Sequence, residues 1–292
     1  MSTVALYLHG GRPDAIGLGL DLHRWLSERG HLVIVGSPGE AALLEAAGGE
    51  PVAGDGAGAA VDLVVSVGGD GTMLRATRRA VAADADVLGV NLGHLGYLAE
   101  VEPGAWEAAL DDYFAGRHGI AERLLLASQL AGIDDEHTGP GGLGLPPALN
   151  EVVIEKEAMG RTVRLGVSID GAFFHSYVAD GVIIATPTGS TAYSLSARGP
   201  IMAPTHRGLI LTAVSPHSLF DRSLVLEPSS TLEVAVLGDR PAGVAVDGEH
   251  IRVLPTGATV TVTADDRPAR FVTFGGRDFH RILKLKFGLN NR

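Results

Sequence analysis

The chain has 292 residues, 46% of them hydrophobic, and a mean hydropathy of +0.21, which excludes a disordered protein and suits two packed domains. The formal net charge of −11 argues against a nucleic-acid partner, because phosphate polyanions are bound by basic surfaces. Cysteine is absent, which excludes disulfides and thiolate metal sites and fits a reducing compartment.

The N-terminus has the pattern of a first strand over residues 4–8, without the basic and long apolar regions of a signal peptide. Charges, Gly and Pro interrupt every apolar run before it reaches the length of a membrane span. We therefore expect a cytoplasmic protein with no membrane partner.

The first 122 residues alternate between strand and helix patterns. Strands are predicted near residues 4–8, 31–36, 63–67 and 87–90, and helices near 16–26, 40–47, 73–83 and 103–114. Alternation of this kind predicts an α/β domain with a parallel doubly wound sheet over residues 1–122.

The buried strand at 63–67 ends in Gly68-Gly69-Asp70-Gly71-Thr72. Glycines without a Cβ allow a phosphate to approach the backbone, and the carboxyl edge of a parallel sheet is where ligands bind. The segment predicts a phosphate-binding turn with its own carboxylate, and Arg75 is one helical turn further on. The alternative is a purely structural turn in which Asp70 or Thr72 caps the helix.

A second glycine loop at residues 91–100 follows the next strand, and its Tyr97 either stacks on a base or packs in the core. From about residue 123, many short alternating runs predict an all-β sandwich-like domain over 123–275. The polar, glycine-rich segment 132–147 is predicted to be an exposed loop. Residues 276–292 look amphipathic, and we expect this C-terminal extension to pack back on the first domain.

Several familiar motifs are missing. The chain has no P-loop, no complete G-x-G-x-x-G fingerprint, no H-E-x-x-H and no G-x-S-x-G, and its only lysines are Lys156, Lys284 and Lys286. The 11 histidines show no metal-ligand spacing, so we predict no metal ligands among the protein side chains.

Three segments of the second half carry polar groups suited to a nucleotide. Asn150-Glu151 precedes a strand and suits ribose hydroxyls, or forms a strand-edge turn. The block 186–201 leads from a strand into a hydroxyl-rich loop and a short helix, which suits a diphosphate or ribose, or is a structural turn. Asp247-Gly248 between strands indicates a two-residue hairpin.

These motifs occur in the order and spacing of the NAD kinases, which the chain resembles over roughly residues 60–290. GGDGT alone is shared with diacylglycerol kinases, sphingosine kinases and phosphofructokinases, whereas the Asn-Glu pair with T-P-T-G-S-T-A-Y-S-L-S is far more specific. The resemblance implies transfer of a phosphoryl group to the 2′-hydroxyl of the adenosine ribose of NAD, producing NADP. A lipid or sugar kinase of the same superfamily and a non-catalytic dinucleotide sensor are the alternatives.

The resemblance implies that Asp70 is the catalytic base. It places Tyr97 near the adenine, Asp180 on the nicotinamide half, and Arg75 and Arg161 near phosphates. The full set of implied binding residues is Gly71, Arg75, Tyr97, Asn150, Glu151, Arg161, Asp180, Thr191, Ala192, Tyr193, Ser194, Leu195, Ser196, Asp247 and Glu249.

The resemblance further implies ATP or polyphosphate as donor, with Mg²⁺ bound through the donor's phosphates rather than by protein side chains, and a homodimer or homotetramer. Two positions depart from the family pattern. Val178 stands where Arg is common, and Arg198 where Gly is common.

Overall fold

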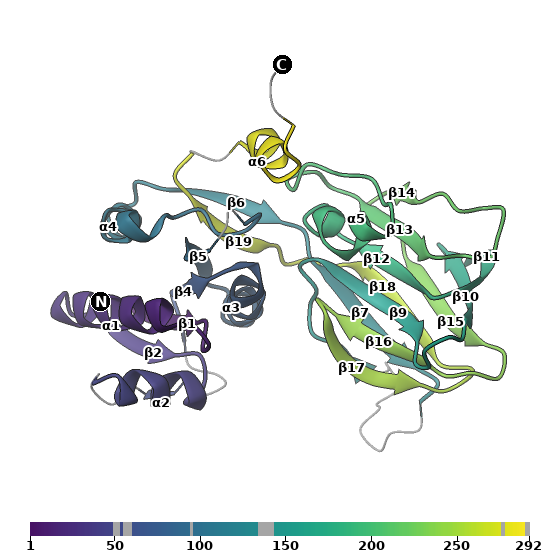
Figure 1. Cartoon of the computed structure of the whole chain (residues 1–292), viewed down its shortest axis with the longest axis horizontal. Coiled ribbons are helices and arrows are strands. Elements are labelled where there is room, and N and C mark those ends of the chain that lie inside the picture. The colour runs from purple at the N-terminus through teal and green to yellow at the C-terminus, as the bar shows by residue number, and fades with distance from the viewer. Residues whose placement is uncertain (49–52, 55–59, 94–95, 134–142, 276–277, 290–292) are drawn as a thin grey trace. The chain divides into compact units, whose positions relative to one another are not determined.

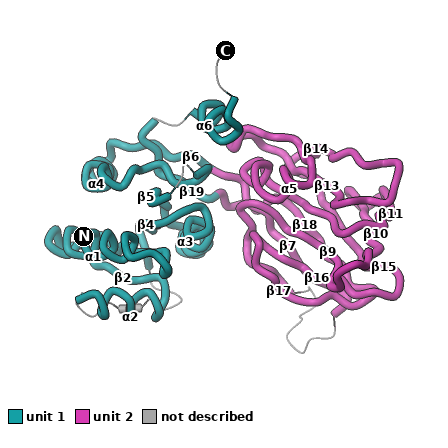
Figure 2. The backbone as a smooth tube through the Cα atoms, viewed as in Figure 1, with its two compact units in different colours: residues 1–122, 269–292 teal, residues 123–268 magenta. Residues whose placement is uncertain are grey.

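The structure is a computed structural model that describes residues 1–48, 53–54, 60–93, 96–133, 143–275 and 278–289 (Figure 1). The chain divides into two compact units, residues 1–122 with 269–292, and residues 123–268 (Figure 2). In the described part of the chain, no helix is both long and apolar enough to cross a membrane.

The first unit contains a seven-stranded sheet. In spatial order its strands are β3 (Ala53–Gly54), β2 (Leu32–Val35), β1 (Thr3–Leu8), β4 (Leu63–Gly68), β5 (Asp86–Asn91), β19 (Ala269–Thr273) and β6 (Gly119–Arg123). Every neighbouring pair from β3 to β19 is parallel. From β1 the chain order of the strands runs outward in both directions, to β2 and β3 on one side and to β4 and β5 on the other, so the predicted doubly wound parallel sheet is confirmed.

Helices cover both faces of this sheet. They are α1 (Pro13–Glu28), α2 (Pro38–Ala46), α3 (Asp70–Ala83) and α4 (Trp106–Phe114), with a 3-10 turn at Pro103–Ala105. The last helix of the unit, α6 (Phe279–Lys286), lies against Tyr97. Residues of α1, α2 and α4 share one core cluster with the sheet residues Leu88 and Val90. Gly89 points to the opposite face, where a Cβ would lie 2.9 Å from Met73 Sδ of α3.

The second unit is a sandwich of two six-stranded sheets, as predicted. One sheet has the order β11 (Ala172–Ala179), β10 (Val163–Ile169), β15 (Leu232–Leu237), β18 (Thr259–Ala264), β7 (Leu126–Ala131) and β8 (Leu143–Gly144). The other has β14 (Leu224–Leu226), β13 (Leu209–Val214), β12 (Gly181–Ala185), β9 (Glu151–Lys156), β16 (Ala242–Val246) and β17 (Glu249–Leu254). One apolar cluster joins their inner faces.

The other face of the β9 sheet is covered by the block after β12. That block forms a 3-10 turn, Gly189–Thr191, and the short helix α5, Tyr193–Ser196. Val153, Ile183 and Ile210 of the sheet pack there against Met202. The hydroxyl-rich block is therefore attached to the sheet by an apolar core of its own.

The structure differs from the sequence expectation at the end of the second domain. We expected residues 123–275 to form it, but β19 pairs in parallel with β5 of the first unit. The sequence of a five-residue strand does not indicate which strand it will pair with, so the pattern could not show this return. The segment 134–142 of the expected loop lies outside the described residues.

Candidate active site

Asp70 is the first residue of α3, directly after the glycines that end β4. Its Oδ2 accepts a hydrogen bond from the Tyr97 N–H at 3.0 Å, and its Oδ1 accepts one from the Leu98 N–H at 3.1 Å. Gly96 lies so close that a Cβ there would collide with the carboxylate. The second glycine loop thus fixes the orientation of Asp70 through both of its oxygens.

The glycines around Asp70 serve two different purposes. A Cβ at Gly68 would lie 2.6 Å from Thr72 Oγ1, so packing requires glycine there. At Gly69 and Gly71, by contrast, a Cβ would have no atom of the described chain within 4 Å. These two glycines, with His9, Gly10, Thr72 and Arg75, line a cavity of about 310 Å³. The open space beside Gly69 and Gly71 fits an anionic group at the start of a helix.

Arg75 lies at the edge of that cavity but already has partners. Its Nη1 donates to Glu40 Oε1 at 2.8 Å, and its Nη2 donates to the Leu8 carbonyl at 2.9 Å. The Arg75 side chain is 49% exposed, whereas that of Glu40 is 5% exposed. Sequence reasoning placed Arg75 near a phosphate and did not find Glu40, which looks like an ordinary residue of a surface helix.

Tyr97 packs against α6. Its ring centroid is 6.4 Å from that of Phe279, and Lys286 Nζ is 4.4 Å from the centroid of the same ring. Burial, and then the Asp70 charge, raise the pKa of Tyr97. Of the two uses expected for Tyr97, the structure shows packing against α6, and the contact with an adenine stays a prediction. Residues 94–95 of this loop lie outside the described residues.

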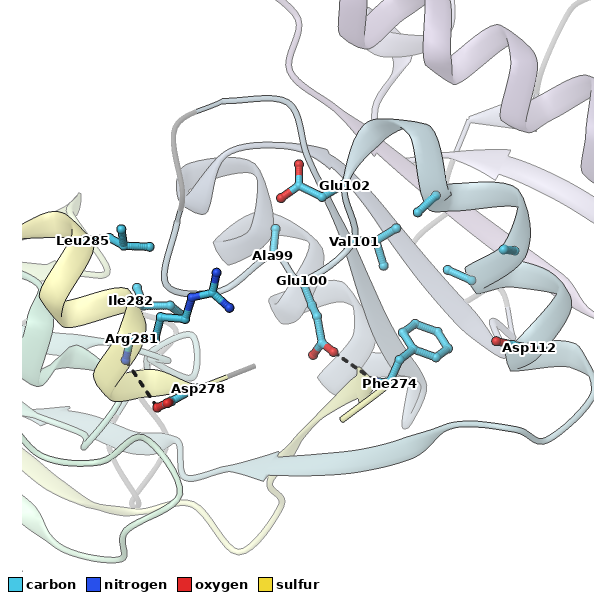
Figure 3. A pocket seen from close by; sticks show the side chains of 13 residues that line it. Ala99, Glu100, Val101, Glu102, Asp112, Phe274, Asp278, Arg281, Ile282 and Leu285 are labelled. Carbon is cyan, nitrogen blue, oxygen red and sulfur yellow. Dashed lines mark hydrogen bonds between the residues drawn. The ribbon is translucent and has the colours of Figure 1, made fainter. Parts of the chain in front are cut away.

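A cavity of about 510 Å³ lies beside the same loop, between Ala99–Glu102, α4 and α6 (Figure 3). Arg281 extends into it from α6, while Glu100 Oε1 accepts a hydrogen bond from the Phe274 N–H at 3.0 Å. Most of the remaining wall is Ala, Val, Ile and Leu. None of the predicted binding residues lines this cavity.

In the second unit, the turn at Leu149, Asn150 and Glu151 is held by Asp247. The Asp247 carboxylate accepts the backbone N–H groups of all three residues, at 2.9, 2.7 and 3.2 Å. Thr186 holds the other side of the turn, because its Oγ1 donates to the Leu149 carbonyl and its N–H to the Asn150 carbonyl. Asp247 was predicted to bind ligand; the structure shows its carboxylate bonded to backbone, and a contact with ligand stays a prediction.

The Asp247 carboxylate can accept these backbone N–H groups because the hairpin turn orients it toward them. Asp247 and Gly248 have φ values of +50° and +79°, as the predicted two-residue hairpin requires. Gly189 also belongs to this assembly, since a Cβ there would collide with the Asn150 carbonyl. The spacing of these segments along the chain does not indicate that they meet.

Glu151 is 5% exposed, and its Oε2 is buried without a hydrogen-bond partner in the described part of the chain. Burial and the nearby Asp247 charge raise the pKa of Glu151 to about 8, although a hydrogen bond from the Tyr193 N–H lowers it in part. Glu151 is therefore mostly protonated at neutral pH and can donate a hydrogen bond as well as accept one.

The hydroxyl-rich block contains both core and surface residues. Tyr193 is 37% exposed, and burial, then the charges of Glu155, Asp180 and Glu151, raise its pKa. Ser194 is fully buried, and its Oγ lies 3.5 Å from Thr212 Oγ1, so its side chain serves the core. Thr191 Oγ1 donates to the Thr188 carbonyl. Ala192 and Leu195 are half-buried, and Ser196 is exposed.

The remaining predicted residues lie at different depths. Asp180 is half-buried and pairs with Lys156 Nζ at 2.5 Å, a partner that sequence reasoning did not assign. Arg161 and Glu249 are exposed. The Arg161 backbone N–H donates to the Ala158 carbonyl, and Glu249 starts β17 opposite Val246. Each unit thus assembles its own part of the predicted set.

Among the described residues, no group of three or more His, Cys, Asp or Glu side chains is arranged to hold a metal ion. The polar groups at the cavity beside Gly69 and Gly71 are backbone N–H groups, Thr72, His9 and Arg75. Donors of this kind suit phosphate oxygens.

The sequence matches two family models. Residues 9–118 match the ATP-NAD kinase N-terminal domain, and residues 149–274 match the ATP-NAD kinase C-terminal domain. The chain is 32% identical over 297 residues to the NAD kinase of Syntrophotalea carbinolica, with all of both chains covered. It is 36% identical over 325 residues to NAD kinase 1 of Streptomyces coelicolor, covering all of this chain and 87% of that relative.

Solved structures of the same kind are also similar. Yeast NADH kinase complexed with NADH has a TM-score of 0.86 at 25% identity, covering 100% of this chain and 89% of that one. An NAD kinase from Archaeoglobus fulgidus in complex with ATP has a TM-score of 0.68 at 22% identity, covering 98% and 96%. At that identity the second likeness concerns the fold alone.

Proposed function

We propose, because the chain belongs to the NAD kinase family, that it phosphorylates NAD at the 2′-hydroxyl of the adenosine ribose and releases NADP. The observation that carries the assignment of its reacting group is the Asp70 carboxylate, which two backbone N–H groups hold in one orientation, in a residue whose two neighbours, Gly69 and Gly71, line an open cavity.

In this mechanism Asp70 accepts the proton of the ribose hydroxyl as that oxygen bonds to the transferred phosphorus. The bond from the phosphorus to the donor's bridging oxygen breaks, and the leaving phosphate keeps that electron pair. Phosphoryl transfer depends chiefly on positioning and charge stabilisation. A carboxylate held through both oxygens is suited to this, because it cannot rotate away from the hydroxyl.

The donor is assigned to the cavity lined by Gly69, Gly71, Thr72 and Arg75, and ATP is our choice because the family is described as ATP-NAD kinase. Backbone N–H groups at the start of α3 and the Arg75 guanidinium would contact its phosphates. Mg²⁺ bound to those phosphates would neutralise charge on the leaving group.

The acceptor is assigned to the Asn150-Glu151 turn and the exposed face of the block from Thr191 to Ser196. A protonated Glu151 beside Asn150 supplies both donors and acceptors for ribose hydroxyls. Tyr193 offers a partly exposed ring for the dinucleotide, and Asp180 is the group assigned to the nicotinamide half.

Incubation with NAD, ATP and Mg²⁺ tests the function directly. We expect NADP, detected with an NADP-specific dehydrogenase, and none when NAD is replaced by a lipid or a sugar. Dinucleotide binding without NADP would support a sensor. Replacing ATP by polyphosphate, and NAD by NADH, then defines both substrates. Light scattering tests the expected homodimer or homotetramer.

A further inference from the structure

Glu40, the buried carboxylate of α2, is bonded to Arg75, which lines the proposed donor site. We propose that Glu40 is a positioning residue for phosphoryl transfer, which holds the Arg75 guanidinium at the edge of the glycine-lined cavity. The proposal rests on the proposed function, because it assumes that a donor phosphate binds there.

Glu40 is placed by the start of α2. Ser37 is the N-cap residue, and its side chain accepts a hydrogen bond from the Glu40 N–H at 3.2 Å. The residue is 4% exposed, with Ala41 and Leu44 of the same helix buried beside it. Burial of a carboxylate is unfavourable unless a cation and hydrogen bonds compensate for the lost water.

The burial of the Glu40 carboxylate is only partly compensated by hydrogen bonds and charge. Glu40 Oε1 is bonded to Arg75, but Oε2 is buried without a hydrogen-bond partner among the residues that the structure describes. Burial raises the pKa of Glu40, against the opposing effects of Arg75, the Leu8 backbone and the Ser37 side chain. A pair of this kind contributes little to stability, so stabilising the fold is a poor reason for its presence.

The ion pair between Glu40 and Arg75 restricts the orientation of the Arg75 guanidinium. Glu40 and the Leu8 carbonyl each receive one of its N–H groups, from two different terminal nitrogens. A guanidinium carries five N–H donors in one plane, so two fixed bonds define that plane and leave donors for an anion. Because half of the side chain is exposed, these donors can be reached from solvent. Preorganised donors of this kind stabilise charge without reorganising during the reaction.

The test is Glu40→Gln, which keeps the shape and the hydrogen-bond acceptor but removes the charge. We expect the KM for ATP to rise about tenfold, the size of one charge-assisted hydrogen bond, with the KM for NAD within about twofold of its original value. The matched control is Glu45→Gln, since Glu45 is an exposed carboxylate of the same helix, and it should change neither constant.

Arg75→Ala completes a double-mutant cycle. If Glu40 acts through Arg75, the double variant Glu40→Gln/Arg75→Ala has the same KM for ATP as Arg75→Ala alone. Arg75→Lys leaves the buried carboxylate untouched and should also raise the KM for ATP, because an ammonium lacks the planar fork.

Equal changes of both KM values, additive effects in the cycle, or a melting temperature that falls with no change in KM would each overturn the proposal. These results differ from failure of the proposed function, in which the unaltered protein itself makes no NADP.

Discussion

Each of the two units contains one carboxyl group that we assign to the proposed function, and the two groups are held in opposite ways. Asp70 receives one backbone N–H on each oxygen and lies between Gly69 and Gly71, where a Cβ would meet open space. Glu151 is buried, leaves one oxygen without a partner in the described chain, and has its pKa raised to about 8. Burial favours the neutral form of a carboxyl group, which is why the pKa of Glu151 is raised.

Because of this difference, the carboxyl groups of Asp70 and Glu151 are suited to different roles. A carboxylate with a spare lone pair on each oxygen can accept a proton from a ribose hydroxyl. A buried neutral acid can donate a hydrogen bond and discriminate between ligands, because an unpaired partner in such a site is costly. The comparison predicts that changes at Asp70 affect turnover, and changes around Glu151 affect binding and stability.

The largest effect is expected for Asp70→Asn. The amide keeps the size of the side chain but cannot accept the proton, so turnover should fall roughly 10²-fold or more while NAD still binds. Steady-state kinetics and calorimetric titration with NAD measure the two quantities. Near-normal turnover would remove the distinction between the two carboxyl groups.

The second-largest effect is expected for Asp247→Ala. It leaves the N–H groups of Leu149, Asn150 and Glu151 without their acceptor, which should lower the free energy of unfolding by about 2 kcal/mol or more. We also expect the KM for NAD to rise at least about tenfold, because the Asn-Glu turn loses its support. Urea denaturation and kinetics test this, with the exposed Asp266→Ala as control. Equal behaviour of the two variants would contradict it.

The pH dependence of the free energy of unfolding tests the ionisation of Glu151 in the folded protein. An acid whose pKa is raised from 4.5 to about 8 on folding contributes stability below pH 4.5, and that contribution is lost as the pH rises toward 8. The advantage of the original chain over Glu151→Gln in urea denaturation should therefore shrink between pH 5 and pH 8. An advantage that stays constant over this range would mean that Glu151 is already ionised in the folded state.

The smallest expected effect concerns Arg198, one of the two positions that depart from the pattern of the resemblance. Its φ is +66°, in the left-handed region that is unfavourable for side chains with a Cβ. Arg198→Gly should raise the free energy of unfolding by about 0.5–1 kcal/mol, since relief of strain exceeds the added flexibility of the unfolded chain. Arg198→Ala keeps the Cβ and should give no such gain in denaturant titrations.

Local pattern was enough to predict several features. The apolar run before Gly68 predicted a buried strand, and the glycines after it predicted a turn that opens a helix. Alternating runs predicted the sandwich, and Asp247-Gly248 predicted the hairpin. Each of these depends on backbone preferences and burial periods within about ten residues.

Contacts between distant segments could not be predicted in this way. The sequence alone determined the two architectures, the glycine turn with its carboxylate, and the family to which these motifs point. Only the tertiary structure decided that β19 returns to the first sheet, that Arg75 faces Glu40, and that Asp247 holds the Asn-Glu turn. The reason is physical. A hydrogen bond or ion pair between residues far apart in the chain depends on where the fold brings them, and local composition carries no record of that distance.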